Sequence, residues 1–253
     1  AAMLRSALEL DMASQGGEQP LDWINILALA AAWRGGTGVT VADTQRAAQA
    51  LRGDTPPERL PGMAGRFFSY YRAAYGAALG GLVGHFAIRR TDPQTGEAEW
   101  IPAYGLKAFS PIAAGYPWSH YPDFGAQRSY GYARPHLGND ILGALGTPIC
   151  AVEGGTVEAL GWNRYGGWRI GIRSDDRKRY YYYAHLRKDT PYAEGLAVGQ
   201  RVQAGEVIGF MGRTGYSAQE NVNNIETVHL HFGLQLIFDE SQKECDSEIW
   251  IDV

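Results

Sequence analysis

The sequence predicts an α+β protein in which a helical N-terminal region precedes an antiparallel β-sandwich or open barrel. Two changes of pattern along the chain support this. Apolar residues recur at mixed three- and four-residue spacing through the first third of the chain, which is typical of amphipathic helices. From about residue 105 onward, short strand-like segments alternate with turns that contain glycine. Glycine is also frequent, with 33 of 253 residues, which favours many tight turns.

Four helices are expected before the pattern changes. Either Thr37 or Thr40 is a suitable N-cap for the third, and the Arg-Gly-Gly at 34–36 ends the second. A proline-rich turn at residues 53–62 separates the third from the fourth. The aromatic residues of the fourth are expected to pack against neighbouring helices. The predicted helices cover residues 4–12, 21–33, 41–51 and 64–79.

The second pattern begins with a predicted β-hairpin and continues as a series of strands. Residues 85–90 and 97–104 alternate as strands do and flank a turn at 92–96. We therefore divide the chain into residues 1–104, a helical region ending in a hairpin, and residues 105–253, a β-rich domain. The charged segment 173–179 is expected to be a hairpin turn. Further strands are predicted within 147–153, 155–162, 168–174, 179–186, 206–212 and 228–238.

Composition excludes some functions and leaves one covalent question open. The formal net charge of -4 argues against a nucleic-acid surface, which needs clustered Lys and Arg. No run approaches the roughly 20 apolar residues of a membrane-spanning helix, and the first residues lack the layout of a signal peptide. The two cysteines, Cys150 and Cys245, exclude a CxxC motif. A disulfide between them and two free thiols remain equally open.

Two histidines lie one residue apart in the strand-like segment 228–238. Side chains alternate along a strand, so His229 and His231 are expected to face one side and Leu230 the other. Two such imidazoles can bind one metal ion, or one can bind metal while the other transfers a proton. The alternative is a pair of structural histidines.

Two further segments carry residues suited to the same chemistry. His136 and Asp140, in "HLGND", come immediately before the strand-like segment 141–152. They offer an imidazole nitrogen and a carboxylate oxygen, which suit zinc. Together with the pair at 229 and 231 they supply three ligands and one spare imidazole. In "YYYYAHL", alternation would place Tyr181, Tyr183 and His185 on one face. His185 is then a candidate for a second proton-handling group.

These motifs, in this order, resemble the LytM/lysostaphin-type zinc metallopeptidases of the M23 peptidase family. The resemblance rests on HLGND, GTPICAVEGGTVEALG, YYYYAHL, VGQRVQAGEVIGFMGRTGYS and HLHFGL, and covers residues 108–238. It implies a lysostaphin-like β-domain with one Zn²⁺ per chain. It also implies a zinc-dependent endopeptidase that hydrolyses the peptide part of bacterial peptidoglycan, and therefore an extracytoplasmic location.

The family's functional residues carry over onto five positions of this sequence. The resemblance assigns the metal ligands to His136, Asp140 and His231. It assigns the general acid and base to His185 and His229, which serve a zinc-activated water and the leaving amine. Tyr130, Tyr132 and Tyr183 are weak candidates for hydrogen bonds to the substrate, and ordinary packing is the favoured interpretation for each.

Two parts of the chain depart from the family pattern. Residues 218–227 intervene between the glycine-rich turn and the HxH motif and are expected to form a loop beside the groove. The N-terminal region matches no known motif. Three roles stay open for it: occluding the groove, docking an envelope partner and linking to a membrane anchor.

Two other functions compete with the enzyme. They are a catalytically silent or autoinhibited envelope scaffold or activator, and a binding module. Because every expected ligand and catalytic position is filled, the enzyme is favoured.

Overall fold

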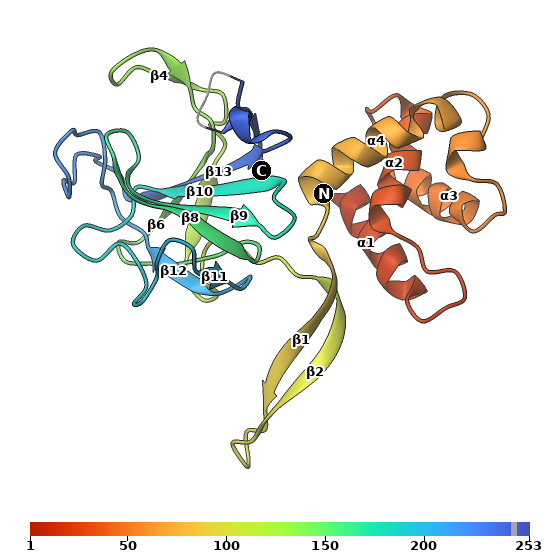
Figure 1. Cartoon of the computed structure of the whole chain (residues 1–253), viewed down its shortest axis with the longest axis horizontal. Coiled ribbons are helices and arrows are strands. Elements are labelled where there is room, and N and C mark those ends of the chain that lie inside the picture. The colour runs from red at the N-terminus through yellow and green to blue at the C-terminus, as the bar shows by residue number, and fades with distance from the viewer. Residues whose placement is uncertain (244–246) are drawn as a thin grey trace. The chain divides into compact units, whose positions relative to one another are not determined.

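The computed structural model describes residues 1–243 and 247–253 and divides them into two compact units (Figure 1). The first unit is Ala1–Lys107 and the second is Ala108–Val253. The first contains the helices and a hairpin, and the second contains all the remaining strands. Each unit has its own hydrophobic core.

The helical unit contains the four predicted helices. They are α1 (Ala2–Ser14), α2 (Trp23–Arg34), α3 (Val41–Leu51) and α4 (Met63–Leu79), with a short 3-10 turn, η1 (Pro57–Arg59). Of the two candidate caps for α3, Thr40 is used, and it forms a capping box with Asp43. Gly35 ends α2 with a φ of 66°, a left-handed conformation that glycine adopts without strain. Because α2 is apolar all round, it forms the centre of this core.

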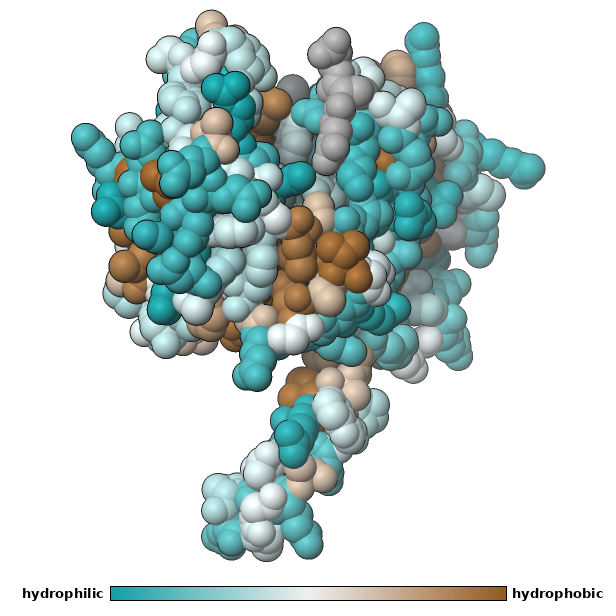
Figure 2. Space-filling view, turned by 60° about the vertical axis from the view of Figure 1, so that its left-hand side comes forward, coloured by the Kyte–Doolittle hydropathy of each residue, from teal (hydrophilic) through white to brown (hydrophobic). Residues whose placement is uncertain are grey.

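The predicted hairpin follows α4 and consists of β1 (Val83–Thr91) and β2 (Ala98–Leu106). Its base is tied to the helices, because the Tyr104 hydroxyl donates to Asp11 Oδ1 at 2.8 Å. Asp11 is buried and also accepts the backbone N–H of Trp23 at 2.9 Å. The outer half of the hairpin is exposed, and Figure 2 shows mainly hydrophilic residues at its far end. Within the described residues, no helix is long and apolar enough to span a bilayer.

The second unit is built on an eight-stranded sheet with antiparallel pairing between neighbours. Its order is β11-β8-β9-β10-β13-β6-β3, and β14 also pairs with β13. The strands are β3 (Trp118–Tyr121), β6 (Asn139–Gly143), β8 (Gly155–Asn163), β9 (Gly167–Ser174), β10 (Arg179–Ala184), β11 (Arg201–Val202), β13 (His229–Leu236) and β14 (Ile249–Ile251). This confirms the predicted class, an antiparallel β-domain preceded by helices.

Two smaller sheets complete the unit. One pairs β7 (Pro148–Cys150) with β12 (Val207–Phe210), and the other pairs β4 (Gln127–Arg128) with β5 (Arg134–Pro135). Ile149 of β7 and Ile208 of β12 belong to the same core as Ile170, Tyr181 and Leu230 of the main sheet. One face of the main sheet therefore packs on the β7–β12 pair. Cys150 is buried, whereas Cys245 lies outside the described residues, so the two alternatives, a disulfide and two free thiols, both stay open.

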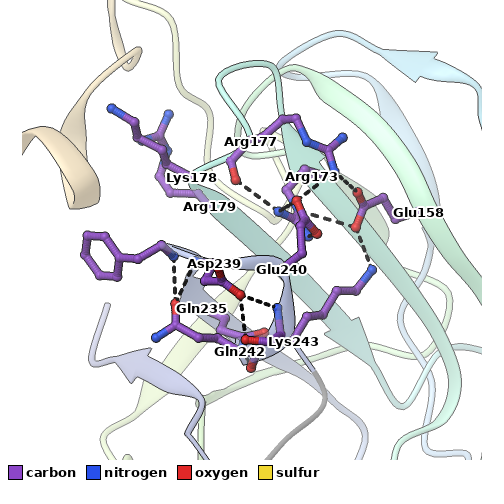
Figure 3. A network of polar contacts seen from close by, with 12 residues as sticks. Glu158, Arg173, Arg177, Lys178, Arg179, Gln235, Asp239, Glu240, Gln242 and Lys243 are labelled. Atoms are coloured by element: carbon purple, nitrogen blue, oxygen red, sulfur yellow. Dashed lines mark hydrogen bonds and ion pairs between the residues drawn. The ribbon is translucent and has the colours of Figure 1, made fainter.

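The charged segment 173–179 is a hairpin turn between β9 and β10, as predicted, but two of its arginines are buried (Figure 3). Arg173 is 1% exposed; its Nη2 lies 3.0 Å from Glu240 Oε2 and its Nε lies 3.3 Å from Glu158 Oε2. Lys243 also binds Glu158, with Nζ and Oε2 2.6 Å apart. These ion pairs hold the 3-10 turn η2 (Glu240–Gln242), which follows β13, against strands β8 and β9.

Candidate active site

The face of the main sheet that turns away from the core lines a groove of about 1430 Å³. Strand β13 contributes His229 and His231 to this groove and Leu230, with no exposed surface, to the core. The prediction that the two histidines face one side is therefore confirmed. The groove is also lined by His136, Asp140, Tyr182 and His185.

Three side chains bring their donor atoms together in the groove. His136 Nε2 lies 2.7 Å from His231 Nδ1. Asp140 Oδ1 lies 3.3 Å from His136 Nε2 and 3.5 Å from His231 Nδ1. The sheet explains this meeting of distant segments, because Asp140 of β6 is the direct cross-strand partner of His231 of β13. His136 reaches the same point from the segment that leads into β6.

This donor set fits a divalent metal ion. Asp140 Oδ1 is buried, yet it accepts no hydrogen bond from any residue that the structure describes. A buried acceptor without a partner is costly, and a cation between Oδ1 and the two imidazole nitrogens would satisfy it. Two imidazoles and one carboxylate also match the ligands of three-ligand zinc sites. His136, Asp140 and His231 are the residues that would hold such an ion.

The ionisation of the donors suits metal binding as well. Burial works to raise the pKa of Asp140, but its contacts with His136 and His231 outweigh burial and hold this pKa below its usual range. Burial lowers the pKa of His231. The carboxyl group is therefore ionised and the His231 imidazole neutral near pH 7, the forms that bind a metal ion.

Two further histidines, His185 and His229, lie beside the donor set with ring centroids 4.7 Å apart. The Nδ1 of His185 is 2.9 Å from the carbonyl oxygen of Thr214, and the Nδ1 of His229 is 2.9 Å from that of Thr227. A carbonyl oxygen only accepts, so Nδ1 of each ring donates to it, and in the neutral form of either ring the lone pair is on Nε2. His229 Nε2 lies 3.6 Å from Asp140 Oδ1, so its lone pair is next to the donor set.

His185 reaches the groove through a local departure from the strand. Strand β10 ends at Ala184, and His185 has a φ of 60°, a left-handed conformation that is strained for a residue with a Cβ. Its backbone N–H is held by the carbonyl oxygen of Gly166 at 2.7 Å. Burial, followed by repulsion from His229 and His231, lowers the pKa of His185 well below its usual value. The imidazole is therefore neutral near pH 7.

The same departure corrects the predicted alternation along β10. Tyr181 and Tyr183 face the core, not the side of His185, because the strand ends before the histidine. Tyr183 has no exposed surface, and its hydroxyl accepts the backbone N–H of Val152 at 2.9 Å. It therefore does not line the groove, and of the two interpretations for Tyr183 the structure agrees with packing and not with substrate contact. Tyr182, which the sequence analysis missed, lines the groove with its ring centroid 5.7 Å from that of His231.

The other two tyrosines differ in placement. Tyr132 lines the groove and is 57% exposed, whereas Tyr130 stacks on Tyr216 with centroids 4.6 Å apart and is not among the lining residues. The inserted segment 218–227 is a loop without helix or strand, and its residues 224–227 line the groove. Its predicted position is confirmed. The loop also supplies the Thr227 carbonyl oxygen that holds His229.

Three residues around the donor set escaped the sequence analysis. Asp123 is 6% exposed and places Oδ2 3.2 Å from His136 Nδ1, while its Oδ1 accepts the backbone N–H of Asp140 at 3.2 Å. Arg128 donates to Asp123 and, at 3.1 Å, to Asp140 Oδ2. Asp123 lies in a loop and Arg128 in the two-residue strand β4, which is too short to carry a periodic signal. A Cβ on Gly138 would lie 2.7 Å from His231 Nε2, so the glycine inside the HLGND motif was a signal that could have been used.

The fold and the groove together define a class of protein. Three donors that could hold a metal ion beside an antiparallel sheet, with two imidazoles next to them, form a constellation typical of metal-dependent hydrolases. The sequence comparison agrees, because residues 134–244 match the profile of peptidase family M23. The β-rich unit thus contains a segment that matches this family.

Named relatives agree with this match. The chain is 35% identical over 177 residues to an L-Ala–D-Glu endopeptidase of Bacillus subtilis (strain 168), covering 66% of this chain and 52% of that protein. It is 38% identical over 98 residues to the glycyl-glycine endopeptidase ALE-1 of Staphylococcus capitis, covering 38% and 24%. The chain thus spans about half, or less, of the length of these relatives.

The structural comparison extends over the whole chain. A lytM protein from Ruminococcus gnavus ATCC 29149 is 24% identical, covers 98% of this chain and 83% of its own, and gives a TM-score of 0.52. At this identity the likeness shows the fold alone. Since it covers nearly the entire chain, that likeness includes the helical unit.

Proposed function

We propose that this chain is a zinc-dependent endopeptidase that hydrolyses peptide bonds of bacterial peptidoglycan. One observation carries the proposal: Asp140 Oδ1, buried and without a hydrogen bond from the described residues, is surrounded by nitrogens of His136, His231 and His229 within 3.6 Å. The substrate is inferred from relatives that are named endopeptidases, among them a peptidoglycan DD-endopeptidase of Vibrio cholerae. Peptidoglycan lies outside the cytoplasmic membrane, so we propose an extracytoplasmic location.

Within this proposal the five groove residues have separate roles. His136, Asp140 and His231 would hold one zinc ion per chain, and that ion would supply a Lewis acid that polarises a peptide carbonyl and acidifies water. His185 and His229 direct Nε2 to the groove, because Nδ1 of each ring is held by a carbonyl oxygen. One of them accepts the proton of the attacking water at Nε2; the other takes up a proton from solvent at Nε2 and delivers it to the leaving amine. The Thr214 and Thr227 carbonyl oxygens hold the rings for these transfers.

Zinc content is the first test. Purified wild-type chain is expected to contain about one zinc per chain, released by a chelator, as for a three-ligand site. His136→Ala is expected to lose the zinc, whereas His229→Ala is expected to keep it. His85→Ala, in the hairpin of the helical unit, is the matched control and should leave the zinc content unchanged. A wild-type chain without zinc would favour the binding module over both the enzyme and the scaffold.

Hydrolysis of purified peptidoglycan is the second test, and it separates the enzyme from a silent scaffold. The wild type and His85→Ala are expected to release new amino groups, and His136→Ala and His229→Ala are not. A wild type that binds zinc but releases no amino groups would support the scaffold or activator. Normal cleavage by His229→Ala would show that the histidine roles are wrongly assigned.

A further inference from the structure

One wall of the groove is formed by the small hairpin of β4 and β5, which carries Arg134. The pairing of this hairpin continues past β5, because the His136 N–H donates to the carbonyl oxygen of Ala126 at 2.8 Å. Residues two apart on such an extended segment point the same way. Arg134 and His136 accordingly both line the groove. The guanidinium thus belongs to the wall that also presents a metal donor.

Arg134 is held rigidly by neutral groups. Its Nη1 donates to the carbonyl oxygen of Tyr130 at 2.7 Å. Its guanidinium carbon lies 4.4 Å from the ring centroid of Tyr165 and 5.5 Å from that of Tyr132. A cation stacked on aromatic rings keeps its charge and is already oriented, so little freedom is lost when it binds a ligand.

The charge of Arg134 has no carboxylate partner among the described residues. Arg128, on the partner strand of the same hairpin, differs in this respect, because it is paired with both Asp123 and Asp140. Glu248, another residue of the groove, accepts a hydrogen bond from Trp250 Nε1 at 2.7 Å and makes no ion pair with Arg134. Arg134 therefore keeps its remaining N–H donors available to a molecule in the groove.

We propose that Arg134 binds a carboxylate of the substrate, so that the enzyme selects an acidic peptide, with a free glutamyl carboxylate near the cleaved bond, over a glycine chain. This inference rests on the proposed function. A planar guanidinium and a carboxylate form paired, charge-assisted hydrogen bonds. A glycine chain offers no carboxylate. On binding it would remove water from the Arg134 guanidinium without replacing the hydrogen bonds that the water made.

The test uses two synthetic stem-type peptides that differ only in a glutamyl carboxylate or carboxamide, together with pentaglycine. The zinc-loaded full chain is expected to cleave the acid with kcat/KM about 10- to 100-fold higher than the amide, the size of a charge-assisted hydrogen bond. Arg134→Gln is expected to cleave acid and amide equally, with the loss confined to the acid. Arg134→Lys keeps the positive charge but lacks the planar guanidinium, so its preference for the acid should lie between those of the wild type and Arg134→Gln.

Arg164 provides a matched control. Its guanidinium stacks on the same ring of Tyr165, at 5.3 Å, but Arg164 is exposed and does not line the groove. Arg164→Gln is therefore expected to keep the wild-type preference for the acid. Circular dichroism and zinc content of each variant show whether it has folded.

Binding separates failure of this inference from failure of the proposed function. Dissociation constants of zinc-loaded His229→Ala, with and without Arg134→Gln, are measured for the acid and the amide. A preference for the acid that disappears with Arg134→Gln supports the inference even if no peptide is cleaved, in which case only the proposed function fails. The inference would be overturned if His229→Ala bound the acid and the amide equally and the wild type cleaved them equally, or if the wild type preferred pentaglycine. The proposed peptidase function would then still stand.

Discussion

Asp123 Oδ2 lies 3.2 Å from His136 Nδ1, whereas the other ring nitrogen of His136, Nε2, faces Asp140 and His231. The carbonyl oxygen of Asp123 lies equally close to Nδ1. Both oxygens accept, so the contact places the proton on Nδ1 and leaves Nε2 free for a metal ion. Asp123 thus determines which nitrogen His136 presents.

The first prediction concerns this contact. Asp123→Asn is expected to weaken zinc binding by about 10- to 100-fold, the usual cost of losing the partner of a ligating histidine. Competition with a chromogenic chelator measures the affinity directly. Asp175→Asn is the control, because Asp175 is exposed and its ion pair, among the residues that the structure describes, is with Arg201 at the surface. Unchanged zinc affinity in Asp123→Asn would mean that the contact does not orient His136.

The second prediction concerns Gly138. Gly138→Ala is expected to displace the His231 ring, because the new Cβ would lie 2.7 Å from its Nε2 and Cε1 and 2.8 Å from the carbonyl oxygen of Phe232. Zinc content should fall while the far-ultraviolet circular dichroism stays that of the wild type. Gly96→Ala, where a Cβ meets nothing within 4 Å, tests whether any glycine replacement has this effect. Full zinc occupancy in Gly138→Ala would contradict the close approach.

The third prediction separates two adjacent tyrosines of β10. Tyr183→Phe removes the acceptor of the Val152 N–H in the core, so unfolding is expected to require about 1–2 kcal/mol less while kcat/KM stays the same. Tyr182→Phe is expected to lower kcat/KM, because its side chain lines the groove beside His231. Urea unfolding and peptide hydrolysis measure the two effects. The reverse pattern would place Tyr183 in the groove and Tyr182 in the core.

The fourth prediction concerns the buried ion pair of Arg179 and Glu153. Arg179 has no exposed surface, and its Nε lies 2.8 Å from Glu153 Oε2, which also accepts the hydroxyl of Tyr181 at 2.7 Å. Glu153→Gln leaves the buried guanidinium without this countercharge and is expected to destabilise the β-rich unit by about 3 kcal/mol or more. Arg201→Gln, which breaks the exposed pair with Asp175, should cost less than about 1 kcal/mol. Equal losses in chemical denaturation would show that burial does not decide the effect.

The fifth prediction is a pH dependence of the helical unit. Hydrogen bonds from Thr40 and Arg34 lower the pKa of Asp43 from 3.8 to about 2. A pKa that is lower in the folded state stabilises the fold above pH 3.8, and this contribution is lost as the pH falls towards 2. The free energy of unfolding of the helices, followed by circular dichroism at 222 nm, should therefore fall more between pH 4 and pH 2 in the wild type than in Asp43→Asn. The same slope in both would exclude Asp43 as the source.

The predicted helices and the longer strands emerged from the sequence because their signals are local. Helical spacing, the Thr40 cap and the turn at 92–96 each depend on residues that lie within a few positions of one another. The strands that were missed, β3, β4, β5, β11 and β14, have between two and four residues, too few for alternation to be recognised. They form only because longer strands or a partner hairpin offer an edge to pair with.

The candidate site divides in the same way. Strand alternation was enough to place His229 and His231 on one face, because β13 is regular through both residues. Alternation failed for Tyr183, because β10 ends one residue before His185 and the backbone turns left-handed there. The hydrogen bond from His185 N–H to Gly166 O and the contact of its ring with Thr214, which stabilise this turn, come from other segments.

By itself, the sequence determined the α+β class, the order of the elements and the types of residue available for metal and proton chemistry. Each of these depends on residues that are close together in the sequence. Only the tertiary structure decided that Asp140 lies opposite His231, that Asp123 and Arg128 surround the donor set, and that Arg134 stands in the groove without a carboxylate among the described residues. The physical reason is that cross-strand register and side-chain burial depend on which distant segments pair. That pairing is chosen by the packing of the whole β-rich unit and not by any single motif.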